Sequence, residues 1–251
     1  MDIIGLNETH CQDGDNILNL EGYTLYQFNR KLKKKRSKKS GGLAVLIRNE
    51  IKQGVEVIKQ YHDYYVWLKL DRNMFSCEKS IYICLVYQPP VSSVYNDANS
   101  DTSLISLIES DLVNLVNDDY VLVMGDLNGR TGVEYDFIND DNTIPTQDDV
   151  DMYRSDANIG RRVSQDMNKN ARGDEIIELC TNHKLRILNG RLIGDSQGLF
   201  TCHQSKGSST VDYMIANEEL FHRFKYFHVH TFDGTLSDHC LISSLLKLDV
   251  V

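Results

Sequence analysis

The stretch VLVMGDLNGRTG, residues 121–132, begins as an apolar run and ends on polar residues. Its first half is typical of a strand buried on both faces. Asp126 and Asn128 follow, and residues two apart in an extended chain point to the same side. Ligands of open α/β sheets bind beyond the strand ends, where an aspartate could accept a proton from water and an amide could donate to a phosphate oxygen. The alternative is a plain D-x-N-G turn, because all three residue types favour turns.

Two other apolar runs end on side chains that suit phosphate chemistry. Glu8 follows the run in IIGLNETH, and a carboxylate at such a place is a hard oxygen ligand that suits Mg²⁺. Tyr87 ends the run in LVYQPP, where its phenol could hydrogen-bond a phosphate. A turn or helix cap at Glu8 and core packing of Tyr87 are the structural alternatives.

The C-terminal third of the chain adds a possible carboxylate–histidine pair. Asp212 lies inside the apolar strand pattern STVDYMIA, and buried aspartates are rare unless they are paired. Ser237, Asp238 and His239 come directly before another apolar run, in LSDHCLI. His239 is the natural partner of Asp212, because a carboxylate fixes the tautomer of a histidine and raises its basicity.

The pattern of apolar runs predicts more strands than helices. Strands are expected at residues 2–6, 42–48, 64–70, 80–87, 120–125, 211–216 and 240–246. Helices are expected at residues 101–118, with Asp101 or Thr102 as the cap, and at 171–183 and 217–224. Strands and helices do not alternate one for one, which favours an α/β (α+β) fold of stacked sheets with outer helices. Without a repeat or a clear linker, residues 1–251 are predicted to form a single domain with a basic loop at 30–40 and a long acidic loop at 129–170.

Composition is that of an ordinary globular domain. Hydrophobic residues make up 41% of the 251 and charged residues 25%. No apolar run reaches the roughly 18 residues of a membrane helix, and the N-terminus lacks the features of a signal peptide. We therefore expect an intracellular protein of the nucleus or cytoplasm that is neither secreted nor bound to a membrane. The six cysteines are scattered without a C-x-x-C pair, which favours free thiols over a zinc site or a disulfide framework.

Charge is distributed very unevenly along the chain. The run RKLKKKRSKK, residues 30–39, holds eight of the 27 basic residues and no acidic one. Outside it, 19 basic residues stand against 36 acidic ones, a net charge of −17. This excludes a protein that binds nucleic acid over its whole surface but is compatible with one basic contact beside an acidic site. Lys33, Lys34, Lys35 and Arg36 are the candidates for contacts with DNA phosphates or for a nuclear import signal, the alternative being a solvated insertion.

Taken in order, the motifs GLNETH, VYQPP, GDLNGR, VDYMIA and SDH resemble those of the endonuclease/exonuclease/phosphatase superfamily. Within that superfamily, the chain is most similar to the endonuclease domain of non-LTR retrotransposons. The segments that carry this similarity are SGGLAVLIR after a basic loop, GDLNGRTG, RGDEIIELCTNHKLRILNG and GLFTCHQ…SSTVDYMIAN. The resemblance implies a DNase I-like four-layer sandwich of two mixed sheets flanked by helices. It also implies an N-terminally truncated chain, because the first strand of that family and its asparagine would lie upstream of Met1.

The resemblance further implies a Mg²⁺-dependent DNA endonuclease, with Mn²⁺ as an alternative ion, that leaves a 3′-hydroxyl. In the retrotransposon family this hydroxyl primes a reverse transcriptase domain, which would be a partner beside the DNA. The implied roles in metal binding and water activation are Glu8 as metal ligand, Asp238 as a second acidic contact, Asp126 as base and Asn128 as the residue that places water. The remaining implied roles are Tyr87 on the scissile phosphate, Asp212 orienting His239, His239 stabilising the transition state, and Thr201 and Ser237 as supports.

Two other functions remain open from the sequence. The same fold could act as a phosphatase or phosphodiesterase on a lipid or inositol phosphate. A chain without the first strand could also be a catalytically dead relic of an endonuclease domain. A nucleotide-binding protein is less favoured, because the sequence has no glycine-rich phosphate loop.

Overall fold

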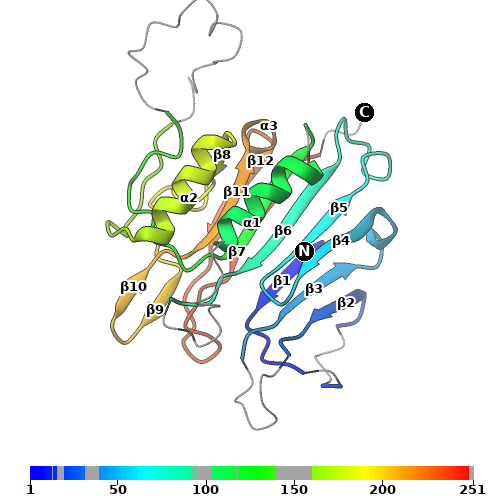
Figure 1. Cartoon of the computed structure of the whole chain (residues 1–251), viewed down its shortest axis with the longest axis horizontal. Helices are drawn as coiled ribbons and strands as arrows, with labels where there is room; N and C mark the ends of the chain where they lie inside the picture. The colour runs from blue at the N-terminus through cyan, green and yellow to red at the C-terminus, as the bar shows by residue number, and fades with distance from the viewer. Residues whose placement is uncertain are drawn as a thin grey trace, which may run out of the picture. The chain divides into compact units, whose positions relative to one another are not determined.

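Figure 1 shows the computed structural model of the chain. The chain forms two compact units. The described residues are 1–12, 14–15, 20–31, 40–91, 93, 103–116, 118–138 and 160–248. The first unit comprises Met1–Asn128, Asp212–Met214 and Lys247–Val251, and the second comprises Gly129–Val211 and Ile215–Leu246. Lys33, Lys34, Lys35, Arg36 and residues 139–159 of the predicted acidic loop lie outside the described residues.

The larger sheet of the first unit places two strand ends side by side. Its strands stand in the order β4 (Val55–Tyr61), β5 (Tyr65–Leu70), β6 (Ile81–Tyr87), β7 (Tyr120–Asp126) and β11 (Asp212–Asn217), followed by β8 (Leu185–Ile187). The first three residues of β11 belong to the first unit. β4, β5 and β6 are antiparallel neighbours, whereas β6 and β7 run parallel. Parallel neighbours need a crossover connection, and here it contains α1 (Leu104–Asp111). The carboxyl ends of β6 and β7 therefore meet at one edge, with Tyr87 opposite Asp126.

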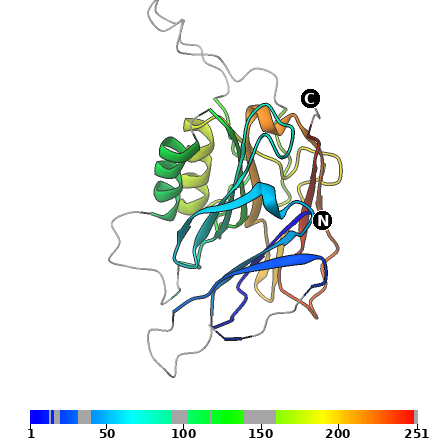
Figure 2. The same ribbon diagram turned by 90° about the vertical axis from the view of Figure 1, so that its right-hand side faces the viewer.

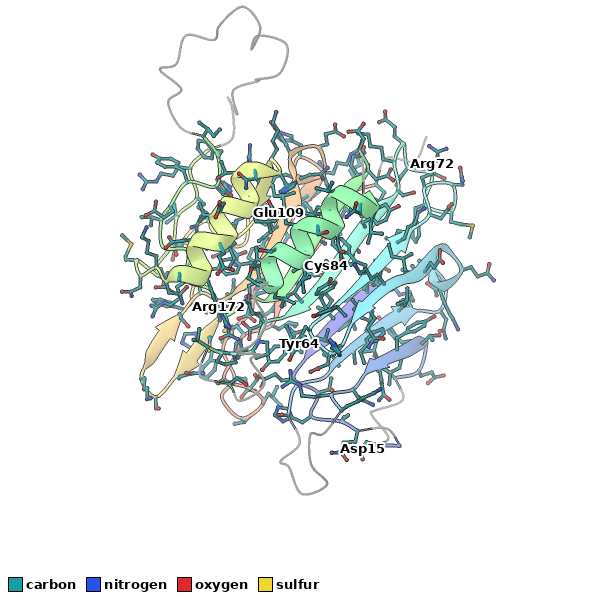
Figure 3. All side chains as sticks on the ribbon, in the orientation of Figure 1. Asp15, Tyr64, Arg72, Cys84, Glu109 and Arg172 are labelled. Atoms are coloured by element: carbon teal, nitrogen blue, oxygen red, sulfur yellow. The ribbon has the colours of Figure 1, made fainter. Side chains whose placement is uncertain are left out.

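Helix α1 covers one face of this sheet (Figures 1 and 2). Trp67 of β5 donates its indole N–H to Asp111 at the end of α1, over 2.9 Å. Cys84 of β6, labelled in Figure 3, is fully buried. The predicted helix over residues 101–118 is confirmed in its core, and a π-helical turn continues it through Leu112–Val116. The predicted cap was wrong, because Ser103 is the N-cap and its hydroxyl accepts the backbone N–H of Ser106.

A second sheet lies on the opposite face of the first one (Figure 2). Its order is β1 (Ile3–Asn7), β3 (Leu43–Arg48) and β2 (Tyr23–Phe28), all antiparallel. Gly5 of β1 lies so close to Leu85 of β6 that a Cβ on Gly5 would come within 2.6 Å of the leucine side chain. Tyr87 lies two residues beyond Leu85 and therefore faces the same side, toward the end of β1.

The second unit consists of shorter elements. Helix α2 (Ala171–Asn182) is capped by the side chain of Asn170, and β8 (Leu185–Ile187) pairs with the last residues of β11. β9 (Cys202–Gln204) and β10 (Gly207–Ser209) form a hairpin, and α3 (Glu218–Phe221) leads into the antiparallel pair of β12 (Phe224–Val229) and β13 (Ile242–Leu246). The predicted mixed α/β class is confirmed. Of the helices in the described residues, none combines the length and the apolar character that crossing a membrane requires.

Both described flanks of the predicted acidic loop are packed. Asp166 is 2% exposed and accepts two hydrogen bonds from the guanidinium of Arg130 and one from the backbone N–H of Thr210. Burial by itself would raise the pKa of Asp166, but these hydrogen bonds hold it below its ordinary value. Asp136 is likewise buried and paired with Arg191. Several acidic residues of this region therefore anchor the second unit instead of facing solvent.

Candidate active site

The adjacent ends of β6 and β7 form the first part of the candidate site. Asp126 is 5% exposed, and its backbone carbonyl accepts the N–H of Gln88 over 2.8 Å. The backbone N–H of Tyr87 donates to the carbonyl of Tyr64 over 2.7 Å. Hydrogen bonds to both neighbouring strands thus fix the backbone from which the two side chains project.

Asp126 and Asn128 form a turn that also holds the carboxylate. The backbone N–H of Asn128 donates to Asp126 Oδ1 over 2.9 Å, and its side-chain amide donates to Asp126 Oδ2 over 2.8 Å. The same amide nitrogen donates to the carbonyl of Gln88 over 2.8 Å. The turn that the motif allowed is therefore present. Because both amide protons point to the protein, Asn128 orients the Asp126 carboxylate in this arrangement.

Tyr87 and Glu8 meet although they are far apart in the sequence. The hydroxyl of Tyr87 donates to Glu8 Oε1, and the imidazole of His10 lies 3.4 Å from Glu8 Oε2. Glu8 remains 46% exposed. Burial, followed by the hydrogen bond to Glu8 and the charges of Glu8 and Asp126, raises the pKa of Tyr87 far above its ordinary value. Tyr87 is therefore a permanent hydrogen-bond donor beside an accessible carboxylate.

Arg30 is a residue of this site that the sequence did not reveal. Its guanidinium donates to Asp63 over 2.5 Å and lies 5.5 and 5.8 Å from the ring centroids of Tyr64 and Tyr87. Tyr64 is labelled in Figure 3. Only 6% of Arg30 is exposed, so the predicted basic loop begins with a buried, ion-paired residue. The sequence alone does not distinguish Arg30 from the other basic residues of this run, because its acidic partner lies 33 positions further along the chain.

Two buried side-chain oxygens belong to residues that are adjacent in the sequence to Glu8 and Tyr87, and they are of the type that a hard divalent cation prefers. The side-chain oxygens of Asn7 and Gln88 are buried and accept no hydrogen bond from the described part of the chain. The amide nitrogen of Asn7 donates to the carbonyl of Val86 over 3.0 Å, which holds this side chain beside the end of β6. Buried oxygens without a donor favour an ion or a water, and Mg²⁺ prefers carboxylate and carbonyl oxygens. Sequence reasoning missed both residues, although Asn7 directly precedes Glu8.

A second carboxylate lies close to Asp126 within the first unit. Asp212 begins β11 and is 8% exposed, and carboxylate oxygens of Asp126 and Asp212 lie within 4.8 Å of each other. His239 belongs to the second unit. The Asp212–His239 pair therefore stays a prediction.

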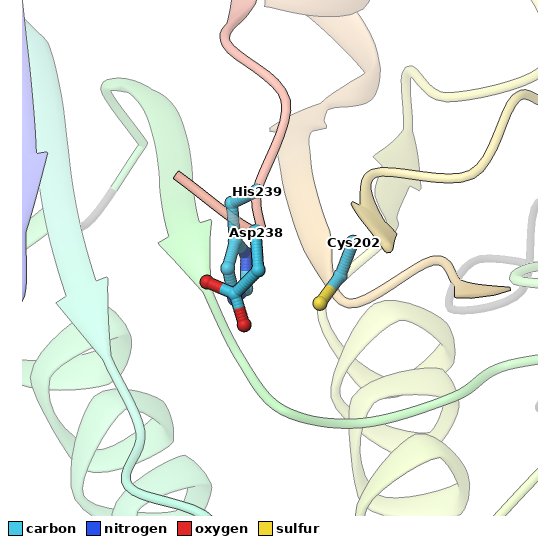
Figure 4. A group of neighbouring side chains, drawn as sticks. All are labelled: Cys202, Asp238 and His239. Carbon is cyan, nitrogen blue, oxygen red and sulfur yellow. The ribbon is translucent and has the colours of Figure 1, made fainter. Parts of the chain in front are cut away.

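The remaining predicted residues gather within the second unit. Thr201 is fully buried, and its hydroxyl accepts the backbone N–H of Val211 over 3.1 Å. The hydroxyl of Ser237 accepts the backbone N–H of His239 over 3.0 Å. Asp238 is exposed, and Figure 4 shows it with His239 and Cys202. Thr201 and Ser237 thus hold backbone that carries the ionisable residues.

Solved structures with the same fold include several enzymes that process nucleic acid. The AP endonuclease LMAP of Leishmania major is 12% identical, with 99% of this chain and 79% of that chain covered and a TM-score of 0.68. The endonuclease domain of TRAS1, a telomere-specific non-LTR retrotransposon, is 14% identical, with 91% and 82% covered and a TM-score of 0.55. The 3′ phosphatase NExo from Neisseria, bound to a product DNA hairpin, is 12% identical, with 98% and 89% covered and a TM-score of 0.58.

At this level of identity the solved structures show a common fold, and no curated protein sequence matches the chain. The characteristic sequence pattern of one family, however, matches residues 1–239. The chain therefore belongs to the endonuclease/exonuclease/phosphatase family.

Proposed function

We propose that the chain is a divalent-metal-dependent DNA endonuclease that nicks one strand and leaves a 3′-hydroxyl. The observation that carries the proposal is the arrangement of Glu8, Tyr87 and Asp126 at the ends of β1, β6 and β7. It combines an exposed carboxylate, a protonated phenol and a second carboxylate that a turn holds in place. Hydrolysis of a phosphodiester can use these three groups as a metal ligand, a hydrogen-bond donor to the phosphate and a general base.

The roles of the residues follow from their contacts. Asp126 accepts the proton of the attacking water as the oxygen bonds to phosphorus and the bond to the 3′ oxygen breaks. Asn128 keeps the Asp126 carboxylate oriented through two hydrogen bonds. Tyr87 turns its hydroxyl from Glu8 to a phosphate oxygen. Glu8, with the side-chain oxygens of Asn7 and Gln88 as candidate further ligands, would hold Mg²⁺ or Mn²⁺, which would offset charge on the phosphate.

The second unit supplies the remaining groups in this proposal. His239, oriented by Asp212, donates a hydrogen bond to the phosphate as negative charge develops. Asp238 gives a further acidic contact to metal or substrate, while Thr201 and Ser237 support the backbone.

DNA is the proposed substrate. The similar solved structures include an AP endonuclease, a retrotransposon endonuclease domain and a 3′ phosphatase bound to a product DNA hairpin. Lys33, Lys34, Lys35 and Arg36 would contact phosphates in an otherwise acidic chain. A reverse transcriptase domain that extends the new 3′-hydroxyl is the proposed partner, and the nucleus or the cytoplasm is the proposed compartment.

Nicking of supercoiled plasmid by the full chain tests the proposal directly. We expect open-circular product with Mg²⁺, none with EDTA, and closure of the nick by DNA ligase, which requires a 3′-hydroxyl and a 5′-phosphate. Phosphoinositide and sphingomyelin are tested in parallel. Turnover of either lipid without nicking would favour the phosphatase or phosphodiesterase function, and a folded chain without turnover on any substrate would favour the dead relic.

Replacing Tyr87 with Phe should lower the nicking rate roughly 10- to 100-fold, because a hydrogen bond to a charged phosphate contributes about 1.5–3 kcal/mol. Tyr82→Phe is the matched control, since Tyr82 lies on β6 and points to the opposite face. The wild-type rate should show no loss from titration of the phenol up to about pH 10, the ordinary pKa of tyrosine, because the pKa of Tyr87 is raised. Equal rates for Tyr87→Phe and Tyr82→Phe would exclude the proposed contact.

A further inference from the structure

Three side chains of the second unit form a cluster that includes a thiol. The sulfur of Cys202, a carboxylate oxygen of Asp238 and a ring nitrogen of His239 all lie within 4.8 Å of one another (Figure 4). We call these three residues the thiol cluster. All six cysteines of the chain are free, so Cys202 carries a thiol.

The backbone holds the thiol cluster in place. Cys202 and His239 face each other across an isolated antiparallel bridge, and residues opposite each other in such a bridge share a face. The N–H of His203 donates to the carbonyl of Asp238, and the N–H of Cys240 donates to the carbonyl of Thr201, both over 2.7 Å. These bonds flank the bridge on both sides and fix the backbone that carries the three side chains.

The donor atoms of the thiol cluster favour a different class of ion than the oxygen atoms around Glu8 do. Thiolate, imidazole and carboxylate together are the ligands of zinc sites, and three protein ligands leave a fourth position open. Mg²⁺ prefers oxygen atoms and is a poor ion for a thiolate. Cys202 is buried, whereas Asp238 is exposed and His239 half-buried, so an ion can enter from the side of Asp238. The sequence gives no zinc motif here, because the ligands are separated by more than 30 positions.

We propose that the thiol cluster binds a thiophilic divalent cation of the Zn²⁺ class and that this ion inhibits phosphodiester hydrolysis. A sulfur–metal bond forms as the proton of the Cys202 thiol leaves to solvent. A ring nitrogen of His239 and an oxygen of Asp238 would be the other two ligands of the ion. The inhibition rests on the proposed function, because a His239 that binds the ion can no longer donate a hydrogen bond to the phosphate. Binding of the ion does not depend on the proposed function.

Co²⁺ titration of the full chain tests binding without any activity. Cobalt bound to a thiolate absorbs through a sulfur-to-metal charge-transfer band. We expect this band in the wild type and in Cys240→Ser, whose cysteine is also buried, and its loss in Cys202→Ser. A Cys11→Ser background removes a more accessible thiol. An unchanged band in folded Cys202→Ser would overturn the site.

A second variant keeps the test valid if Cys202→Ser fails to fold. Asp238 is exposed, so Asp238→Asn should fold normally, as circular dichroism would show. It should weaken Co²⁺ binding at least tenfold, because it removes a charged ligand and even the loss of a group that only supports a ligand costs roughly tenfold or more. Unchanged affinity would exclude Asp238 as a ligand and overturn the three-residue site.

Inhibition is measured on Mg²⁺-supported nicking with added Zn²⁺. The wild type should lose activity at Zn²⁺ concentrations that fill the thiol cluster, and Cys202→Ser should stay active. Equal sensitivity of the two proteins would overturn the inhibitory role. A chain that never nicks but shows the cobalt band would refute the proposed function while supporting the metal site.

Discussion

Asp126→Asn is expected to lower the rate of plasmid nicking about 10²- to 10⁴-fold while the protein stays folded, because a positioned general base contributes that much to catalysis. Asparagine has nearly the same shape and retains one oxygen, which can accept one of the two hydrogen bonds that Asn128 donates to Asp126. It cannot, however, accept the proton of the attacking water. The effect should appear at saturating DNA, since the change removes a step of the chemistry and leaves the contacts with DNA intact.

Glu56→Gln is the matched control for this loss of charge. Glu56 is an exposed carboxylate of β4 in the same unit, so the variant changes net charge equally without touching the ends of β6 and β7. Initial nicking rates, together with thermal midpoints of the three proteins, separate catalysis from stability. If Asp126→Asn and Glu56→Gln nicked DNA at similar rates, Asp126 would not be the base.

The ends of β6 and β7 could be predicted from the sequence because each combines two local signals. An apolar run marks each strand, and a polar or aromatic residue directly follows or ends it. A helix between two such runs indicates a parallel crossover, which brings both carboxyl ends to one edge. The contacts of Asp126 with Asn128 are also local, which is why a turn and a functional carboxylate were both compatible with the motif.

Contacts between distant residues could not be predicted in this way. Nothing near Arg30 in the sequence indicates Asp63, and nothing near Asn7 or Gln88 indicates that their oxygens are buried without a donor. The missed strands β2, β4, β8, β9, β10 and β12 are short or carry polar residues on one face, so they lack the continuous apolar run of β6. Ser103 was missed as a helix cap because Asp101 and Thr102 are equally suitable by residue type.

Gly125→Ala is expected to lower the free energy of unfolding by roughly 3 to 5 kcal/mol. Gly125 has a φ of 131°, which disfavours any side chain. It also lies opposite Val86, and a Cβ would come within 2.0 Å of the carbonyl oxygen of that residue. Since this oxygen belongs to the backbone of β6, the clash can be relieved only by moving β7 away from β6.

Gly207→Ala separates the two causes. Gly207 has nearly the same φ, 129°, but a Cβ there would meet no atom within 4 Å. The Gly207→Ala variant should therefore lose only the stability that the unfavourable φ costs, roughly 1 to 2 kcal/mol. Free energies of unfolding from denaturant titration give both values, and equal losses would show that the approach to Val86 is unimportant. A larger loss for Gly125→Ala would mean that the glycine before Asp126 sets the strand spacing that brings Asp126 beside Tyr87.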